Sequence, residues 1–101
     1  MSAEKRTAEI HPTAVVHPGA VLGEGTTVGA YSVIGEHVRL GHGNRVGPHA
    51  VIEGHTVLGD ENVVFQFASV GSQPQDQKYK GEPSTLVVGH RNIIREYVTL
   101  Q

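Results

Sequence analysis

The feature that most constrains this chain is an aliphatic residue at every sixth position. Reading from Ile10 in steps of six meets only Ile, Val or Leu as far as Val70, and the register resumes at Val88 and continues through Ile94 to Leu100. A period of six fits neither the helical repeat of 3.6 residues nor the strand repeat of two. It does fit a short strand followed by a corner, repeated along the chain. The sequence therefore predicts a parallel β-helix.

Two further columns of residues support this interpretation. The residue four places after each aliphatic is small or short in most hexads, as at Ala14 and Asn44, and the residue directly after the aliphatic is usually glycine, as at Gly23. We expect the aliphatic and small side chains to point inward, and glycine to give backbone freedom where the chain turns. Three such hexads make one coil, and coils stack through parallel strands about 4.8 Å apart.

Composition agrees with an all-β fold and excludes several functions. The 101 residues include 15 Val against 5 Leu and 5 Ile, and β-branched side chains favour strands over a helical bundle. A net charge of −2 gives no electrostatic footprint for nucleic acid or an anionic membrane. The absence of cysteine excludes disulfides and thiolate-ligated metal sites. No signal peptide or membrane span is recognisable, so we expect a cytoplasmic protein.

The hexad pattern also predicts the domain organisation. We expect residues 1–9 to form a lead-in and residues 10–101 to form an incomplete β-helix of about four to five coils. The chain stops partway through a hexad without a capping repeat, which indicates the first part of a longer protein. The hexad fails between Gly71 and Leu86, so about twelve residues leave the coil and residues 73–85 are expected to form an extruded loop. Loops on a rigid scaffold often carry binding groups.

This interruption carries the most specific motif of the chain. Residues 75–84 read QDQKYKGEPS, preceded by QFASVG at 66–71 and followed by GHRNIIRE at 89–96. These segments closely resemble the UDP-N-acetylglucosamine O-acyltransferases of lipid A synthesis, a family of hexapeptide-repeat acyltransferases. The loop pattern of that family, QD-x-KY-x-GEP, is filled at every fixed position, and Ser84 stands where threonine is commoner. The resemblance covers essentially the whole chain from residue 10.

The resemblance implies a fold, an activity and a set of site residues. The family forms left-handed β-helices that assemble as homotrimers, with active sites between subunits and neither a metal nor another cofactor. It transfers an (R)-3-hydroxyacyl group from acyl carrier protein to the 3-hydroxyl of UDP-N-acetylglucosamine. By position, Gln75, Asp76 and Lys78 are expected at the sugar-nucleotide site. Asp76 can accept hydrogen bonds from sugar hydroxyls, and Lys78 can place a positive charge near a phosphate.

No catalytic residue is expected within this chain. The general base of the family is a histidine that aligns beyond Gln101. General-base catalysis typically contributes about 10²–10⁴ in rate, so we expect the 101 residues alone not to turn over.

The histidines suggest two stacked groups and one alternative function. None of the seven occupies an inward position, so outward, solvated imidazoles are expected. A spacing of three hexads stacks His37 beneath His55 and also aligns Tyr31, His49 and Phe67. His37 and His42 resemble the histidine pair of gamma-class carbonic anhydrases, which bind zinc between subunits, but a third ligand in a matching place is missing.

A further alternative is not enzymatic. The early end of the chain is compatible with a stand-alone trimerising or scaffold module, whereas the intact QD-x-KY-x-GEP loop favours the acyltransferase interpretation.

Overall fold

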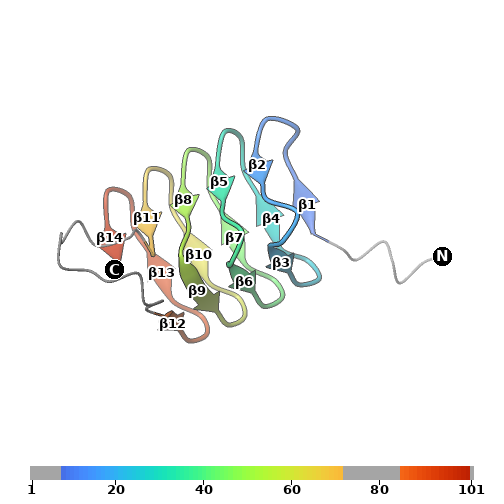
Figure 1. Ribbon diagram of the computed structural model, residues 1–101. Coiled ribbons are helices and arrows are strands. Elements are labelled where there is room, and N and C mark those ends of the chain that lie inside the picture. The colour runs from blue at the N-terminus through green and yellow to red at the C-terminus, as the bar shows by residue number, and fades with distance from the viewer. Residues whose placement is uncertain (1–7, 72–84, 101) are drawn as a thin grey trace, which may run out of the picture.

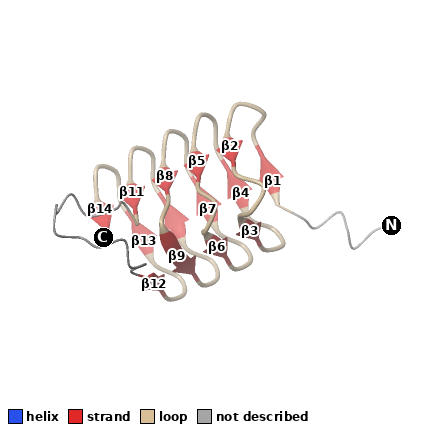
Figure 2. Cartoon of the chain, viewed as in Figure 1, coloured by secondary structure: helices blue, strands red, loops and turns tan. Residues whose placement is uncertain are grey.

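The computed structural model describes residues 8–71 and 85–100, which form fourteen short parallel strands. The strands belong to three sheets, and each sheet makes one side of a rod around which the chain winds (Figure 1). Strands alternate with tight loops along the whole described part, where no helix occurs (Figure 2). Accordingly, no described segment is a helix capable of crossing a membrane.

Consecutive strands always lie in different sheets, so three strands complete one coil. Sheet A contains β1 (Glu9–Ile10), β4 (Thr27–Val28), β7 (Arg45–Val46), β10 (Val63–Val64) and β13 (Ile93–Ile94). Sheet B contains β2 (Val15–Val16), β5 (Val33–Ile34), β8 (Val51–Ile52), β11 (Ser69–Val70) and β14 (Thr99–Leu100). Sheet C contains β3 (Val21–Leu22), β6 (Arg39–Leu40), β9 (His55–Leu58) and β12 (Thr85–Val88).

The register of the sheets follows the sequence repeat. In the first coils a residue pairs with the one three hexads further along the chain, as Val28 does with Val46 in sheet A. In the last coil the paired residues are five hexads apart in sequence, as Val64 and Ile94 are. The difference of two hexads places the extra residues between β11 and β12, which is where the hexad pattern breaks.

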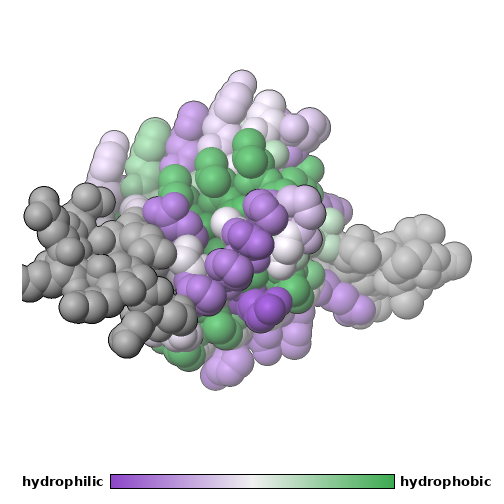
Figure 3. All heavy atoms as spheres, viewed as in Figure 1, coloured by the Kyte–Doolittle hydropathy of each residue, from purple (hydrophilic) through white to green (hydrophobic). Residues whose placement is uncertain are grey.

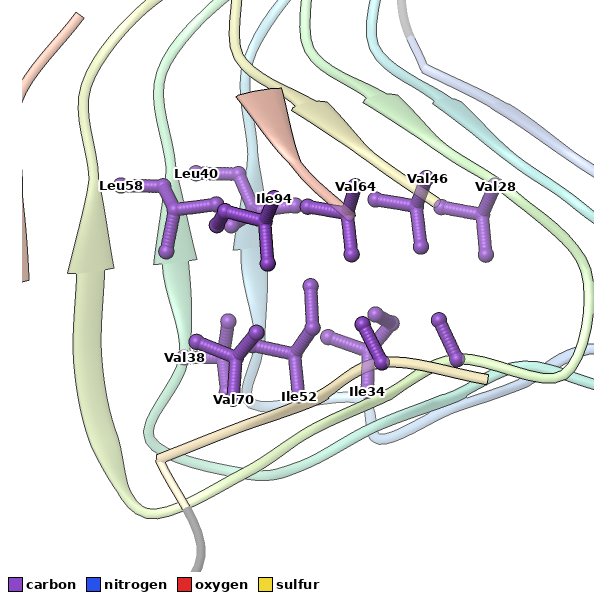
Figure 4. Close-up of a cluster of buried hydrophobic side chains, with 12 residues drawn as sticks. Val28, Ile34, Val38, Leu40, Val46, Ile52, Leu58, Val64, Val70 and Ile94 are labelled. Atoms are coloured by element: carbon purple, nitrogen blue, oxygen red, sulfur yellow. The ribbon is translucent and has the colours of Figure 1, made fainter. Parts of the chain in front are cut away.

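The hexad aliphatics fill the interior of the rod as predicted. Ile34, Ile52 and Val70 of sheet B are at most 1% exposed, and their side chains face those of sheet A across the core (Figure 4). Burying one such side chain contributes about 2 kcal/mol. Two predicted inward positions, Ile10 and Asn92, are exposed instead, because each lies in an end coil with a described neighbour on one side only.

A column of asparagines, buried at Asn44 and Asn62, ties the coils together at the corner between sheets C and A. The backbone N–H of Asn62 donates to Asn44 Oδ1 (2.9 Å), and the backbone N–H of Asn92 donates to Asn62 Oδ1 (2.8 Å). Their amide nitrogens donate to carbonyl groups of the next coil, from Asn44 to Gly59 and from Asn62 to Gly89, each at 2.8 Å. These contacts satisfy polar groups that would otherwise be costly to bury.

Candidate functional site

The residues that flank the predicted loop meet at the corner between sheets B and C. We call residues 35–38, 53–55 and 71 the B–C corner. The backbone N–H of Glu53 donates to the carbonyl of Val70 (3.0 Å), so β11 approaches this corner directly. On the other side of the interruption, Thr85 pairs with His55 in the parallel register of sheet C. Gly71 and Thr85, the described residues on either side of 72–84, therefore lie beside Glu53 and His55.

Two imidazole rings lie one above the other at the B–C corner. The ring centroids of His37 and His55 are 4.3 Å apart and the ring planes are inclined by 8°, which confirms the stacking predicted from the spacing. Glu36 Oε1 lies 3.6 Å from His37 Nε2, and both side chains remain more than half exposed. The corner thus offers imidazole nitrogens and a carboxylate to solvent, which are groups that hydrogen-bond to sugar hydroxyls.

The three site residues expected from the resemblance, Gln75, Asp76 and Lys78, lie outside the described residues. The structure therefore tests neither their positions nor their roles. It does show that the described residues on either side of that segment, Gly71 and Thr85, lie at or beside the B–C corner, with Thr85 paired to one of the stacked histidines. The sequence analysis did not connect the two features. The signal that links them is the resumed hexad register, which sets Thr85 five hexads after its partner His55.

A second polar cluster lies at the corner between sheets C and A. We call residues 23–26, 41–44, 59–62 and 89–92 the C–A corner. Asp60 stands between His42 of the preceding coil and His90 of the following one. Asp60 Oδ1 accepts a hydrogen bond from the His42 backbone N–H (2.9 Å) and lies 3.3 Å from His42 Nδ1. The Asp60 backbone N–H donates to His90 Nδ1 (2.8 Å), so that nitrogen is an acceptor and is occupied.

The described geometry gives no support to a zinc site at His37 and His42. His37 stacks on His55 at the B–C corner, whereas His42 faces Asp60 at the C–A corner. Asp60, His42 and His90 line a cavity of about 320 Å³ together with Glu61 and Arg91. Within residues 8–71 and 85–100, however, no three His, Asp or Glu side chains are grouped closely enough to hold a metal ion.

Comparison with known proteins finds named relatives of this chain, although no family model matches it. The chain is 71% identical over 70 residues to the acyl-[acyl-carrier-protein]–UDP-N-acetylglucosamine O-acyltransferase of Herminiimonas arsenicoxydans, a match covering 69% of this chain and 27% of that protein. It is 45% identical over 92 residues to the acyltransferase of the same name from Thermodesulfovibrio yellowstonii, which covers 91% of this chain and 36% of the relative.

Solved structures agree with the sequence matches. A crystal structure of a UDP-N-acetylglucosamine acyltransferase superposes with a TM-score of 0.86 at 41% identity, over 90% of this chain and 35% of that one. The enzyme of Francisella novicida gives a TM-score of 0.84, also at 41% identity, over 89% of this chain and 33% of that one. The chain is a homologue of the N-terminal part of these acyltransferases.

Two consequences follow from homology with the UDP-N-acetylglucosamine acyltransferases. The three parallel sheets form a left-handed β-helix, as expected from the resemblance. The chain spans about a third of the length of relatives that match nearly all of it, as in Thermodesulfovibrio yellowstonii and Saccharophagus degradans.

Proposed function

We propose that the chain is the N-terminal part of an acyl-[acyl-carrier-protein]–UDP-N-acetylglucosamine O-acyltransferase. The enzyme transfers an (R)-3-hydroxyacyl group from acyl carrier protein to the 3-hydroxyl of UDP-N-acetylglucosamine, the first step of lipid A biosynthesis. The observation that carries the proposal is the match to the named acyltransferases across 91% of the chain. The filled QD-x-KY-x-GEP pattern supports it, as does the position of the described flanking residue Thr85 beside His55 at the B–C corner.

The reaction needs a bound sugar nucleotide, a general base and a thioester. The sugar oxygen attacks the thioester carbonyl, a C–O bond forms, the C–S bond breaks, and the thiolate leaves and takes up a proton. We assign the general base to none of the seven histidines of this chain, because the base of the family aligns beyond Gln101. The contribution of this chain is to bind and orient the nucleotide sugar.

Within that role the three segment residues have distinct tasks. Asp76 accepts hydrogen bonds from sugar hydroxyls, Lys78 supplies positive charge to a phosphate or carboxylate, and Gln75 adds an amide contact. We place the exposed imidazole of His37 and the half-buried imidazole of His55 at the edge of the same site.

The proposed assembly is a cytoplasmic homotrimer whose sites lie between neighbouring subunits and use no metal or other cofactor. A single β-helix supplies only one wall of such a site. Acyl carrier protein would then deliver the hydroxyacyl chain from outside the trimer.

Calorimetric titration of the chain with UDP-N-acetylglucosamine tests the site. We expect Asp76→Ala and Lys78→Ala each to weaken binding about tenfold, a loss of about 1.4 kcal/mol, because each removes a charged hydrogen-bonding group. Lys80→Ala is the matched control, since Lys80 lies in the same segment at a variable position of the pattern. Circular dichroism should show the same β-rich spectrum for all four proteins.

The outcomes separate the interpretations. Equal affinity in Asp76→Ala, Lys78→Ala and Lys80→Ala would show the site assignment to be wrong. A folded parent chain that binds no nucleotide sugar would favour the scaffold module. Stoichiometric zinc, found by elemental analysis after metal-free refolding and re-addition, would favour the anhydrase-like alternative.

A further inference from the structure

The described chain reaches the interruption at Gly71 and resumes at Thr85, and both residues lie against one short bend, residues 53–56. Thr85 pairs with His55 in the register of sheet C. Gly71 packs so closely on Thr56 that a Cβ added to Gly71 would overlap the Thr56 hydroxyl. The bend is therefore placed to control where the chain leaves the rod and where it returns.

On the leaving side, two glycines in the left-handed region interlock. The φ angles of Gly54 and Gly71 are 70° and 82°, a conformation that residues with a Cβ rarely adopt. A Cβ added to Gly54 would lie 2.5 Å from the carbonyl oxygen of Gly71, and a Cβ added to Gly71 would also overlap the carbonyl oxygen of Glu53. The Gly71 N–H donates to the carbonyl of Leu100 (2.6 Å). Gly71 is thus held by both neighbouring coils.

This close fit is not a general property of the column. Gly35 occupies the same column of the repeat two coils earlier, and its φ angle is outside the left-handed region. A Cβ added to Gly35 would lie 3.3 Å from Glu53 Cα, its nearest atom beyond the chain neighbours. The hexad repeat treats Gly35 and Gly71 alike, so the tight fit belongs to the coil that carries the interruption.

On the returning side, the strand pairing extends further than elsewhere in sheet C. β9 and β12 have four residues each, whereas every other described strand has two. β9 pairs with β6 through its last two residues, but with β12 also through His55 and Thr56. These two additional pairs align the chain with sheet C from Thr85 onward, the first described residue after the interruption.

Thr56 joins the two sides. Its side chain is 0% exposed, and its hydroxyl donates to the carbonyl of Glu53 at 2.7 Å, which closes the bend. The hydroxyl thereby fixes the carbonyl against which Gly71 packs, while the Thr56 backbone pairs with Leu86 in β12. Exposed side chains, which Figure 3 shows to be both hydrophilic and hydrophobic, can touch a ligand directly, whereas the buried Thr56 acts only through its neighbours.

We propose that Thr56, together with Gly54 and Gly71, is a positioning residue of the nucleotide-sugar site. The inference rests on the proposed function, which assigns three residues of the motif at 75–84 to that site. A chain segment whose two ends are fixed has fewer conformations to lose on binding, so the bend raises affinity without touching the ligand. Loss of the Thr56 hydroxyl frees the Glu53 carbonyl, loosens both ends and weakens nucleotide binding.

A matched pair of buried threonines tests the proposal. Thr26 at the C–A corner is also 0% exposed, and its hydroxyl donates to the carbonyl of Gly41 (2.9 Å) and accepts from the Asn44 N–H (3.3 Å). Urea unfolding should therefore show at least as large a loss of stability in Thr26→Val as in Thr56→Val. In calorimetric titration with UDP-N-acetylglucosamine, we expect Thr56→Val to raise the dissociation constant about tenfold and Thr26→Val to leave it within about twofold of the parent. Thr56→Ser, which keeps the hydroxyl, should bind like the parent.

Hydrogen exchange tests the positioning without any ligand. The amides of Gly71 and Gly35, in the same column of the repeat, donate to carbonyls of the following coil at 2.6 and 2.8 Å. We expect Thr56→Val to speed exchange of the Gly71 amide at least about tenfold relative to that of Gly35, and Thr26→Val to leave this ratio unchanged. A loss of stability spread over the rod would change both amides together.

Each result supports or overturns the proposal. Equal nucleotide affinity in Thr56→Val and Thr26→Val, with a parent that binds, overturns it and leaves the proposed function standing. An unchanged exchange ratio of Gly71 to Gly35 in Thr56→Val overturns it as well. A folded parent that binds no nucleotide sugar overturns the proposed function, and this proposal with it.

If circular dichroism shows that Thr56→Val is unfolded, a pair of glycines decides in its place. Gly54 and Gly25 have φ angles of 70° and 75°, so Gly54→Ala and Gly25→Ala introduce similar backbone strain. Only at Gly54 does the added Cβ meet Gly71, because the nearest atom to a Cβ at Gly25 lies 3.8 Å away. Weaker nucleotide binding by Gly54→Ala than by Gly25→Ala supports the proposal, and equal binding overturns it.

Discussion

At Gly59 in the C–A corner, glycine is required by the neighbouring coil. A Cβ added to Gly59 would lie 2.5 Å from His90 Nδ1 and 2.9 Å from the carbonyl oxygen of Gly89. A Cβ added to Gly89, one coil later in the same column, meets nothing within 4 Å. The two residues share one position in the repeat, and the coil stacked beyond Gly59 makes the difference. The sequence repeat treats them as equivalent, whereas packing does not.

This contrast predicts opposite effects of one substitution. Gly59→Ala should lower the free energy of unfolding by about 1–3 kcal/mol, because backbone or His90 must shift to admit the methyl group. Gly89→Ala should leave it unchanged or raise it by about 0.4–1 kcal/mol through the entropy of the unfolded chain. Urea unfolding followed by circular dichroism measures both, and equal destabilisation by the two variants would contradict the explanation.

Apart from β1 in the first coil, each two-residue strand of this β-helix buries one side chain more deeply than its neighbour. In β13, Ile93 is 64% exposed while Ile94 is 5% exposed, and in β5, Val33 is 38% exposed while Ile34 is 1% exposed. Alternation along a strand is the cause, and the corner that follows resets the register for the next side. The hexad pattern therefore predicted the inner column at the level of the element.

Truncation of an inward and an outward isoleucine tests the alternation. Ile52→Ala, at a side chain that is 0% exposed, should lower the free energy of unfolding by about 2–5 kcal/mol through lost burial and a cavity. Ile93→Ala, at 64% exposure, should change it by about 0.5 kcal/mol or less. Denaturant titration gives both values, provided that the slope of the unfolding free energy against denaturant concentration is the same in both variants. Similar losses would show that the hexad column is not the core.

As a whole, the molecule is a one-dimensional stack in which each coil contacts only its neighbours. Central strands are hydrogen-bonded on both sides, as β5 is by β2 and β8, whereas β1 pairs with β4 alone among the described strands. In such a stack, stability is a sum of coil and interface contributions, and openings begin at the ends.

Hydrogen exchange should reveal this gradient. The amide of Gly35, which donates to Ile52 in the middle of the rod, should exchange at least about tenfold more slowly than the amide of Glu9, which donates to Thr26 in the first coil. Residue-resolved exchange measured by NMR is the appropriate experiment. Equal protection of the two amides would mean that the rod opens as a single cooperative unit.

The site itself was predictable only in part. The motif at residues 75–84 identified the segment and its family, but Gln75, Asp76 and Lys78 lie outside the described residues. Their neighbours at the B–C corner came from the structure. The Asp60 contacts to His42 and His90 were likewise absent from the sequence analysis, since a spacing rule of three hexads links Asp60 to His42 but not to His90, which lies five hexads further on.

The sequence by itself determined the interior. A period of six selects which side chains point inward, because a strand and a corner repeat without variation. The same regular repeat places His37 on His55, so their stacking could be predicted from the sequence. Tertiary structure decided everything that depends on which coil lies beyond a residue. It stacked Tyr97 on Phe67, set His90 against Asp60, and left Ile10 and Asn92 exposed at the ends. A local repeat fixes the direction of a side chain, whereas its partner is fixed only when the coils are stacked.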